Sequence, residues 1–251
     1  PLVPLIAETG GLNAMLVDST ALPEQVVQDV ITSAFLTAGQ RCSALRLLCL
    51  HEDVAPQILE MLKGAMDELV IGDPADPATD VGPVIDEAAR GRIEDWVEAH
   101  IDAVLHRLAL PPAAAHGTFV PPTLLHVDRV ADLDREIFGP VLHVTTFEAG
   151  AMEATVDEVM ASGYGLTLGV HTRIGSAADA VRARARVGNL YVNRSMIGAV
   201  VGVQPFGGEG LSGTGPKAGG PHYLPRFCVE RTWTVDTTSA GGNASLLSLE
   251  G

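Results

Sequence analysis

The chain has 251 residues, of which 47% are hydrophobic and 19% are charged. Its 31 acidic residues outnumber its 16 lysines and arginines, which gives a formal net charge of −15. A disordered chain would contain fewer apolar residues, and a chain that binds nucleic acid or an anionic membrane would carry clustered basic residues. We therefore expect one or two folded domains, with neither nucleic acid nor a membrane surface as partner.

The chain also lacks the usual marks of export or of a metal site. No apolar run reaches the roughly 18 residues that a membrane-spanning helix needs. The first residues include no methionine and no basic segment, so we expect no signal peptide and an internal cut in a longer protein. Cys42, Cys49 and Cys228 are an odd number without metal-binding spacing. These features indicate a cytoplasmic protein with free thiols and no bound metal.

The first half of the chain predicts helices around a buried strand. Thr20 is expected to cap a helix that Pro23 starts and whose apolar face runs from Val26 to Phe35. Further along we expect a buried strand over residues 44–50, a helix over 54–69, a loop over 72–83 and a helix over 86–108.

The second half alternates between short apolar runs and amphipathic segments. We expect strands over residues 141–147, 166–171 and 189–193, separated by helices over 152–160 and 177–186. Such alternation is typical of an α/β layered domain with a largely parallel sheet. Residues 226–238 resemble an extended strand with an exposed edge, which predicts pairing with a partner subunit. A small, polar tail over 240–251 completes the chain.

Two side chains could carry out chemistry. Cys42 follows Gly39-Gln40-Arg41 where a helical pattern stops, and a nearby cation or oriented backbone N–H groups would make its thiolate a nucleophile. A buried structural cysteine is the alternative. Glu8 precedes a Thr-Gly-Gly turn and could act as a general base if burial raised its pKa, or could be a solvated loop acid.

One glycine-rich run matches a cofactor-binding pattern but is not expected to bind a dinucleotide. Residues 208–213 match G-x-G-x-x-G, the fingerprint of dinucleotide-binding turns. However, no apolar strand precedes this run and no βαβ unit follows it. The match alone therefore does not predict a dinucleotide site.

The order of four short motifs resembles that of the aldehyde dehydrogenases: Glu8-Thr9-Gly10-Gly11, Gly39-Gln40-Arg41-Cys42, Glu136-Ile137-Phe138-Gly139-Pro140 and Pro205-Phe206-Gly207-Gly208. Longer strings, among them AGQRCSALR and VGNLYVNRSMIGAVVGVQPFGGEGLSGTGPKAGGP, are similar to one branch of that superfamily. This branch is the L-glutamate-γ-semialdehyde (pyrroline-5-carboxylate) dehydrogenase part of the bifunctional proline-utilisation flavoenzymes. The resemblance covers nearly the whole chain.

The resemblance implies NAD-dependent oxidation of L-glutamate γ-semialdehyde to L-glutamate, the second step of proline catabolism. Cys42 would be the nucleophile that forms a thiohemiacetal and then a thioester, with its own backbone N–H in the oxyanion hole. Glu8 would activate the water that hydrolyses the thioester. Glu136 and Phe138 would contact the nicotinamide end of NAD.

The same resemblance implies a site for the substrate's α-carboxylate. Ser43 and the backbone N–H groups of Gly198 and Ala199 would hold the carboxylate, because small residues let the main chain approach an anion closely. Phe206 would line the aliphatic part of the pocket. This anchor would separate a semialdehyde acid from a generic aldehyde.

The implied fold is a three-layer αβα aldehyde dehydrogenase catalytic domain with a C-terminal extended oligomerisation strand. Residues 1–8 would be a linker strand from a missing N-terminal NAD-binding half, 9–213 the catalytic domain, and 214–251 a C-terminal arm and tail. The implied partners are that missing half and further copies of the chain in a homo-oligomer. In the family the missing half also supplies an asparagine to the oxyanion hole, and Asn13 follows Glu8 too closely to be that residue.

Two other functions remain open from the sequence. The chain could be a catalytically silent fragment that serves assembly only, which tight NAD binding would contradict. It could also be a cysteine esterase or acyltransferase that uses Cys42 and Glu8 without a nicotinamide. Ester cleavage that is independent of cofactor and lost in Cys42→Ala would support the latter.

Overall fold

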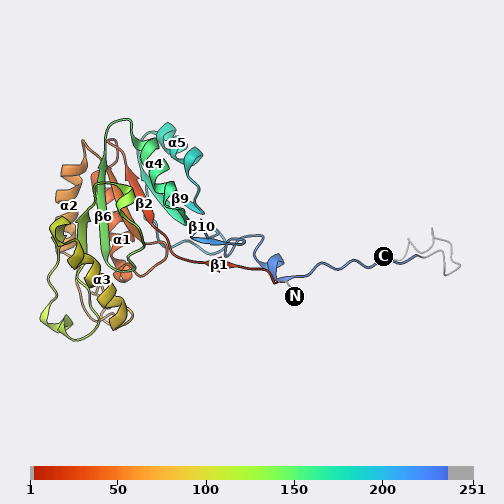
Figure 1. Ribbon diagram of the computed structural model, residues 1–251, viewed down its shortest axis with the longest axis horizontal. Coiled ribbons are helices and arrows are strands. Elements are labelled where there is room, and N and C mark those ends of the chain that lie inside the picture. Colours follow the sequence, from red (N-terminus) through yellow and green to blue (C-terminus); the bar gives the residue numbers. More distant parts are fainter. Residues whose placement is uncertain (1–2, 237–251) are drawn as a thin grey trace.

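A seven-stranded sheet in the order β4-β5-β6-β3-β2-β8-β9 forms the centre of the molecule (Figure 1). The computed structural model describes residues 3–236. Neighbouring strands run parallel except for the antiparallel pair β4–β5 at one edge. The strands of this sheet are β2 (Asn13–Val17), β3 (Leu45–His51), β4 (Val104–Arg107), β5 (Thr123–His126), β6 (Val141–Phe147), β8 (Thr167–His171) and β9 (Asn189–Val192).

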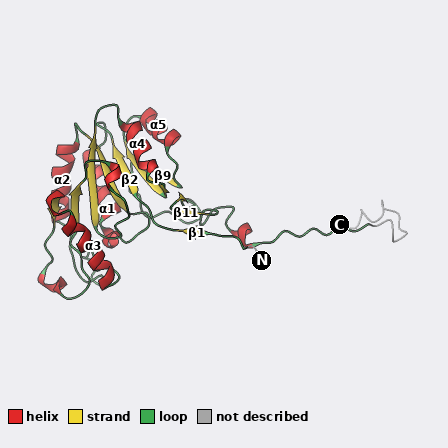
Figure 2. Ribbon diagram, in the orientation of Figure 1, coloured by secondary structure: helices red, strands yellow, loops and turns green. Residues whose placement is uncertain are grey.

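Helices cover both faces of the sheet, as Figure 2 shows. They are α1 (Pro23–Ala34), α2 (Ala55–Asp67), α3 (Glu87–Ala99), α4 (Met152–Ala161) and α5 (Gly175–Arg184). The apolar side chains of α1, α2 and α3 pack in one core cluster, and those of α4 and α5 pack in a second cluster on the opposite face. This arrangement confirms the expected three-layer αβα architecture with a largely parallel sheet.

The central strand β3 explains why its sequence reads as a continuous apolar run. All of its residues are buried. Leu48 contributes to the core cluster on one face and Cys49 to the cluster on the other. A strand that is covered on both faces needs apolar residues at nearly every position, which confirms the expected strand at this place.

An irregularity in the sheet lies where β2 and β3 begin. The register passes from Asn13 opposite Leu45 directly to Ala14 opposite Leu47, so Arg46 has no Cα partner on β2. Bulges of this kind redirect a side chain and occur often beside functional sites. Here the redirected side chain is the guanidinium of Arg46, which is only 1% exposed.

Two expectations about helices are wrong. The helix expected over 86–108 ends at Ala99, and residues 104–107 form the edge strand β4. Pairing of β4 with β5 outweighs local helical propensity in this half-buried stretch. Thr20 does not cap α1, because the cap position is Leu22 and no side chain bonds there. The Thr20 hydroxyl instead donates to Asp18 Oδ1 over 2.6 Å.

Short ribbons extend from the end of the sheet at which the segments of Glu8 and Cys42 lie. Strand β1 (Ala7–Glu8) pairs with β11 (Gly213–Thr214), and β10 (Glu209–Gly210) pairs with β7 (Tyr164–Gly165). The G-x-G-x-x-G run therefore belongs to these ribbons and not to a strand–helix turn, as expected.

The C-terminal segment leaves the layered body (Figure 1). A short 3₁₀ turn covers Leu224–Phe227, and no strand is assigned to residues 228–236. The strand expected over 226–238 is therefore not seen in residues 226–236, the part of it that the structure describes. The tail expected over 240–251 lies outside the described residues. Pairing of this segment with a partner subunit stays a prediction. None of the described helices is long and apolar enough to cross a membrane.

Candidate active site

Cys42 lies at the end of a strained turn that joins α1 to β3. Thr37, Ala38 and Gly39 have φ values of 58°, 53° and 63°, in the left-handed region that residues with a Cβ atom avoid. Gly39 is needed for a second reason, since a Cβ there would lie 2.2 Å from the carbonyl oxygen of Gly139. The turn therefore packs directly against the Glu-Ile-Phe-Gly-Pro motif. Strain of this kind concentrates at functional sites.

Two carboxylates act on the Cys42 thiol. Burial raises the pKa of Cys42, the charge of Glu8 raises it further, and Glu136 adds a smaller effect in the same direction. The backbone N–H groups of Ser43 and Cys42 oppose this by lowering the pKa. The structure thus brings the predicted nucleophile, the predicted base and one predicted cofactor residue into one site. Glu8 itself is exposed, not buried.

The cation expected beside Cys42 does not come from Arg41. Arg41 is exposed, and its Nε–H donates to the Thr37 hydroxyl over 3.0 Å. The guanidinium that interacts with the site is that of Arg46, whose pKa is lowered by burial and raised by Glu136 and by Cys42. Sequence inspection missed this residue, although an arginine inside the apolar run ALRLLCL was a visible signal.

Glu136 is fixed from two sides. Its Oε1 lies 3.1 Å from Arg46 Nη2, and its Oε2 accepts the backbone N–H of Gly11 over 3.1 Å. A Cβ on Gly10 would lie 2.2 Å from Glu136 Oε2, so the glycine pair of the Glu-Thr-Gly-Gly motif permits this close approach. The motif that carries the predicted base therefore also positions the predicted cofactor residue.

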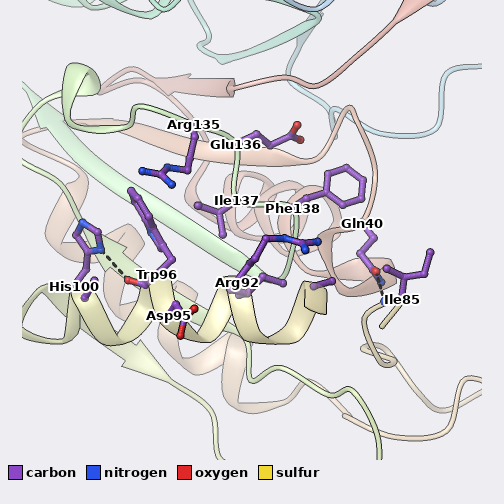
Figure 3. Close-up of a pocket in the computed structure, with 13 residues that line it drawn as sticks. Gln40, Ile85, Arg92, Asp95, Trp96, His100, Arg135, Glu136, Ile137 and Phe138 are labelled. Carbon is purple, nitrogen blue, oxygen red and sulfur yellow. Dashed lines mark hydrogen bonds between the residues drawn. The ribbon is translucent and has the colours of Figure 1, made fainter. Parts of the chain in front are cut away.

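Phe138 stands at the edge of a cavity of about 510 Å³ (Figure 3). Its ring is 44% exposed and lies 5.2 Å from the Arg46 guanidinium. The cavity is lined by Gln40, Ile85, Ala89, Arg92, Ile93, Asp95, Trp96, Ala99, His100, Arg135, Glu136, Ile137 and Phe138. In Figure 3, the guanidinium of Arg135 lies over Trp96, and Arg92 lines the same cavity.

The donor set of this cavity fits the nicotinamide end of a dinucleotide. A carboxylate accepts ribose hydroxyls, an exposed aromatic ring can cover a planar heterocycle, and guanidinium groups pair with phosphates. Glu136, Phe138 and Arg92 supply these three groups around one opening. No cluster that could hold a metal ion exists among residues 3–236.

The residues expected to hold the substrate carboxylate lie on two segments. Ser43 is buried beside Cys42, whereas Gly198 is exposed with a φ of 77° and Ala199 is half-buried. Phe206 is half-buried, and its backbone pairs with that of Ala218. Among the described residues, no hydrogen bond joins Ser43 directly to Gly198, Ala199 or Phe206. Their meeting around one carboxylate stays a prediction.

A polar stripe on α1, formed by Gln25, Asp29 and Ser33, holds the segment that leads to Gly198. Gln25 Nε2 donates to the Asn193 carbonyl over 2.8 Å. Ser33 Oγ accepts the N–H of Met196 over 3.0 Å. Burial raises the pKa of Asp29, and the Ser195 backbone N–H opposes this. Residues spaced by four share one helix face. Helix α1 therefore connects the Gly198 segment to the Cys42 turn at its own C-terminus.

The fold is thus a layered αβα sheet that carries Cys42, Glu8 and Glu136 at one end. The chain belongs to the aldehyde dehydrogenase family, whose family model matches residues 1–233.

Particular relatives narrow this assignment. The chain is 57% identical over 235 residues to the bifunctional protein PutA of Klebsiella aerogenes, which covers 91% of this chain and 18% of that protein. A crystal structure of bifunctional proline utilization A (PutA) superposes with a TM-score of 0.90 at 56% identity, over 96% of this chain and 24% of that one. The 1-pyrroline-5-carboxylate dehydrogenase from Thermus with bound NAD gives a TM-score of 0.79 at 34% identity, over 88% of this chain and 43% of that one.

Proposed function

We propose that this chain supplies the nucleophile, the base and the substrate anchor of an NAD-dependent dehydrogenase. The substrate would be L-glutamate γ-semialdehyde, in equilibrium with pyrroline-5-carboxylate, and the product L-glutamate. The observation that carries the proposal is that three motifs meet at one place: Glu136 Oε2 accepts the backbone N–H of Gly11 in the motif of Glu8, and Gly39 in the motif of Cys42 packs against the Gly139 carbonyl. The similarity to PutA and to a 1-pyrroline-5-carboxylate dehydrogenase supports the substrate.

Cys42 begins the reaction. Burial and two carboxylates, Glu8 more strongly than Glu136, favour the protonated thiol. The thiol must therefore release its proton to solvent water as it attacks. The sulfur bonds to the aldehyde carbon, and the carbonyl oxygen becomes the oxyanion of a thiohemiacetal. The backbone N–H of Cys42 stabilises this charge. NAD⁺, when bound, supplies the acceptor for the hydride that leaves the carbon, so that a thioester remains on Cys42.

Glu8 completes the reaction. It takes a proton from a water molecule, whose oxygen attacks the thioester carbonyl. The carbon–sulfur bond breaks, the sulfur recovers a proton, and L-glutamate leaves. The exposed position of Glu8 on β1 gives its carboxylate access to water.

The cofactor and the wider assembly are part of the proposal. Glu136 and Phe138 would hold the nicotinamide end, beside the cavity lined by Arg92. This chain spans less than a fifth of the curated PutA protein from Klebsiella and less than half of the NAD-bound Thermus chain. We therefore propose that a further N-terminal NAD-binding part completes the site, that the C-terminal segment joins copies into a homo-oligomer, and that the enzyme works in the cytoplasm.

The test measures NADH formation from NAD⁺ and pyrroline-5-carboxylate by the 251-residue chain. A chimera, in which this chain replaces the matching segment of the Klebsiella protein, is assayed in parallel. The decisive variant is Cys42→Ala, and the matched control is Cys228→Ala, because Cys228 is an exposed cysteine outside the site.

We expect NADH from the chimera and its Cys228→Ala variant, and none from Cys42→Ala. Equal activity of Cys42→Ala would overturn the assignment of the nucleophile. A chimera that folds but forms no NADH would overturn the proposal. In that case, hydrolysis of p-nitrophenyl acetate that depends on Cys42 would identify a cysteine esterase, and its absence would identify a silent assembly unit.

A further inference from the structure

The side chain of Asn13 lies behind the nucleophile turn and is only 1% exposed. Its amide nitrogen donates to the Cys42 carbonyl over 2.7 Å and to the Ala44 carbonyl over 2.9 Å. Its amide oxygen accepts the backbone N–H of Thr167 over 3.1 Å. Two carbonyls on one side and an N–H on the other fix the orientation of the amide group.

Asn13 stands where three neighbouring strands begin. It opens β2, while the Cys42 turn leads into β3 and Thr167 opens β8. The Thr167 hydroxyl also donates to the Ser43 carbonyl over 3.4 Å. A buried amide whose hydrogen-bonding groups are all used holds its neighbours in one geometry, since any displacement leaves a buried polar group unpaired.

The geometry of the peptide bond transmits this effect to the sulfur. No described peptide bond is cis, and in a trans peptide the C=O of one residue and the N–H of the next point in opposite directions. Asn13 holds the Cys42 carbonyl on its own side. The Ser43 N–H must then point away from Asn13.

We propose that Asn13 is a positioning residue for the nucleophile: it orients the peptide between Cys42 and Ser43 so that the Ser43 N–H faces the Cys42 sulfur. The backbone N–H of Ser43 lowers the pKa of Cys42. It thereby counters the burial and the carboxylates that favour the neutral thiol. Asn13 acts through Ser43 and touches neither substrate nor cofactor. The inference rests on the proposed role of Cys42 as nucleophile.

The test follows the alkylation rate of Cys42 by iodoacetamide between pH 6 and 10, and needs neither aldehyde nor NAD. A Cys228→Ser background removes the exposed thiol. Cys49, which is fully buried with a pKa raised to about 12, stays unreactive while the chain is folded and so reports unfolding. Failure of the proposed dehydrogenase activity would leave this measurement unaffected.

Asn13→Leu keeps the shape of the side chain without its hydrogen bonds. We expect Cys42 alkylation at pH 8 to be about 3- to 10-fold slower, with the titration midpoint moved to higher pH, because the thiolate loses its N–H donor. Asn13→Asp keeps the acceptor for Thr167, but its carboxyl has one O–H donor at most and none once it is ionised. Its rate relative to the parent should fall further as pH rises, because the new carboxyl can donate only while protonated.

Asn193→Asp is the matched control. Asn193 also bonds one N–H and one carbonyl, both of Thr172, but at the far end of the sheet. The Asn193→Asp change should leave the alkylation rate of Cys42 unchanged. Slower alkylation in both Asn13 variants with Cys49 still protected supports the proposal. A protected Asn13→Leu or Asn13→Asp chain whose Cys42 titrates like the parent would overturn it, as would an equal loss in Asn193→Asp. If Asn13→Leu exposes Cys49, the Asn13→Asp profile alone decides.

Discussion

Arg46 and Glu136 form a buried ion pair between a strand and a loop that are 90 residues apart, with 3.1 Å between Nη2 and Oε1. The remaining guanidinium donors of Arg46 reach the carbonyls of Gly139 and Arg41 over 3.1 Å and 3.2 Å. The Arg46 side chain therefore joins Arg41, which precedes the predicted nucleophile, to Glu136 and to the Glu-Ile-Phe-Gly-Pro motif. Glu136 is held before any ligand arrives.

Removing one partner of this pair should destabilise the chain. We expect Arg46→Met to lower the free energy of unfolding by about 3–5 kcal/mol, because a carboxylate and two carbonyls lose their donors in a buried place. Urea unfolding monitored by circular dichroism measures this loss. Adding Glu136→Gln should recover part of the stability, since no unpaired charge then remains. If the losses of stability caused by Arg46→Met and Glu136→Gln simply add in the double variant, the pairing is contradicted.

The thiol of Cys42 should respond to the charge of Glu8. In the Cys228→Ser background, Glu8→Gln removes a negative charge that raises the Cys42 pKa, so the pKa falls. Alkylation at pH 8 should become roughly 2- to 5-fold faster, since more thiolate is present at a fixed pH. Glu60→Gln, at an exposed site on α2, is the control and should have no effect. A slower rate in Glu8→Gln would refute the coupling.

The polar stripe of α1 should matter for the acid part of the substrate. Ser33→Ala removes the acceptor for the Met196 N–H, and we expect the KM for pyrroline-5-carboxylate to rise about 5- to 10-fold in the chimera, the value of one hydrogen bond. Propanal carries no carboxylate, and its KM should stay unchanged. Thr32→Ala is the matched control, because that hydroxyl bonds only within the helix, to Gln28. Equal effects on both aldehydes would argue against an anchoring role.

His143 should make the fold sensitive to acid. Burial lowers its pKa from 6.5 to about 4, and its ring accepts the Trp96 N–H over 3.0 Å. The unfolded chain takes up this proton near pH 6.5 and the folded chain only near pH 4, so stability present above pH 6.5 is lost as the pH falls through that window.

Protonation of His143 alone should lower the free energy of unfolding by about 3 kcal/mol as the pH falls through this window. Urea unfolding at pH 7 and pH 4.5 measures it. His143→Gln keeps an acceptor for Trp96 without a titrating ring, and its stability should fall less between the two pH values. Parallel losses in parent and variant would show that other groups carry the acid sensitivity.

Much of the fold was predictable from the sequence because its elements are local. The buried strand β3 and the alternation from β6 to β9 follow from apolar runs separated by amphipathic segments. The end of α3 and the edge strand β4 were not predictable, because pairing with β5 decides them. The central strand β2, only five residues long, and the short strand β5 gave no periodic signal long enough to stand out.

The amino-acid order alone is enough to name the residues available for chemistry. The order of its motifs, from Glu8 through Cys42 and Glu136 to Phe206, was sufficient for membership in the family and for the candidate nucleophile. Motifs of this kind are read along the chain, and their order does not depend on how the chain packs.

The surroundings of these residues depend on how the chain packs in three dimensions. The roles of Arg46 and Asn13 depend on a bulge and on three strands that start side by side, and the charges that act on Cys42 come from segments distant in sequence. Hydrogen bonds and electrostatic effects fall off steeply with distance through space and are blind to distance along the chain. They therefore exist only once the sheet has brought the segments together.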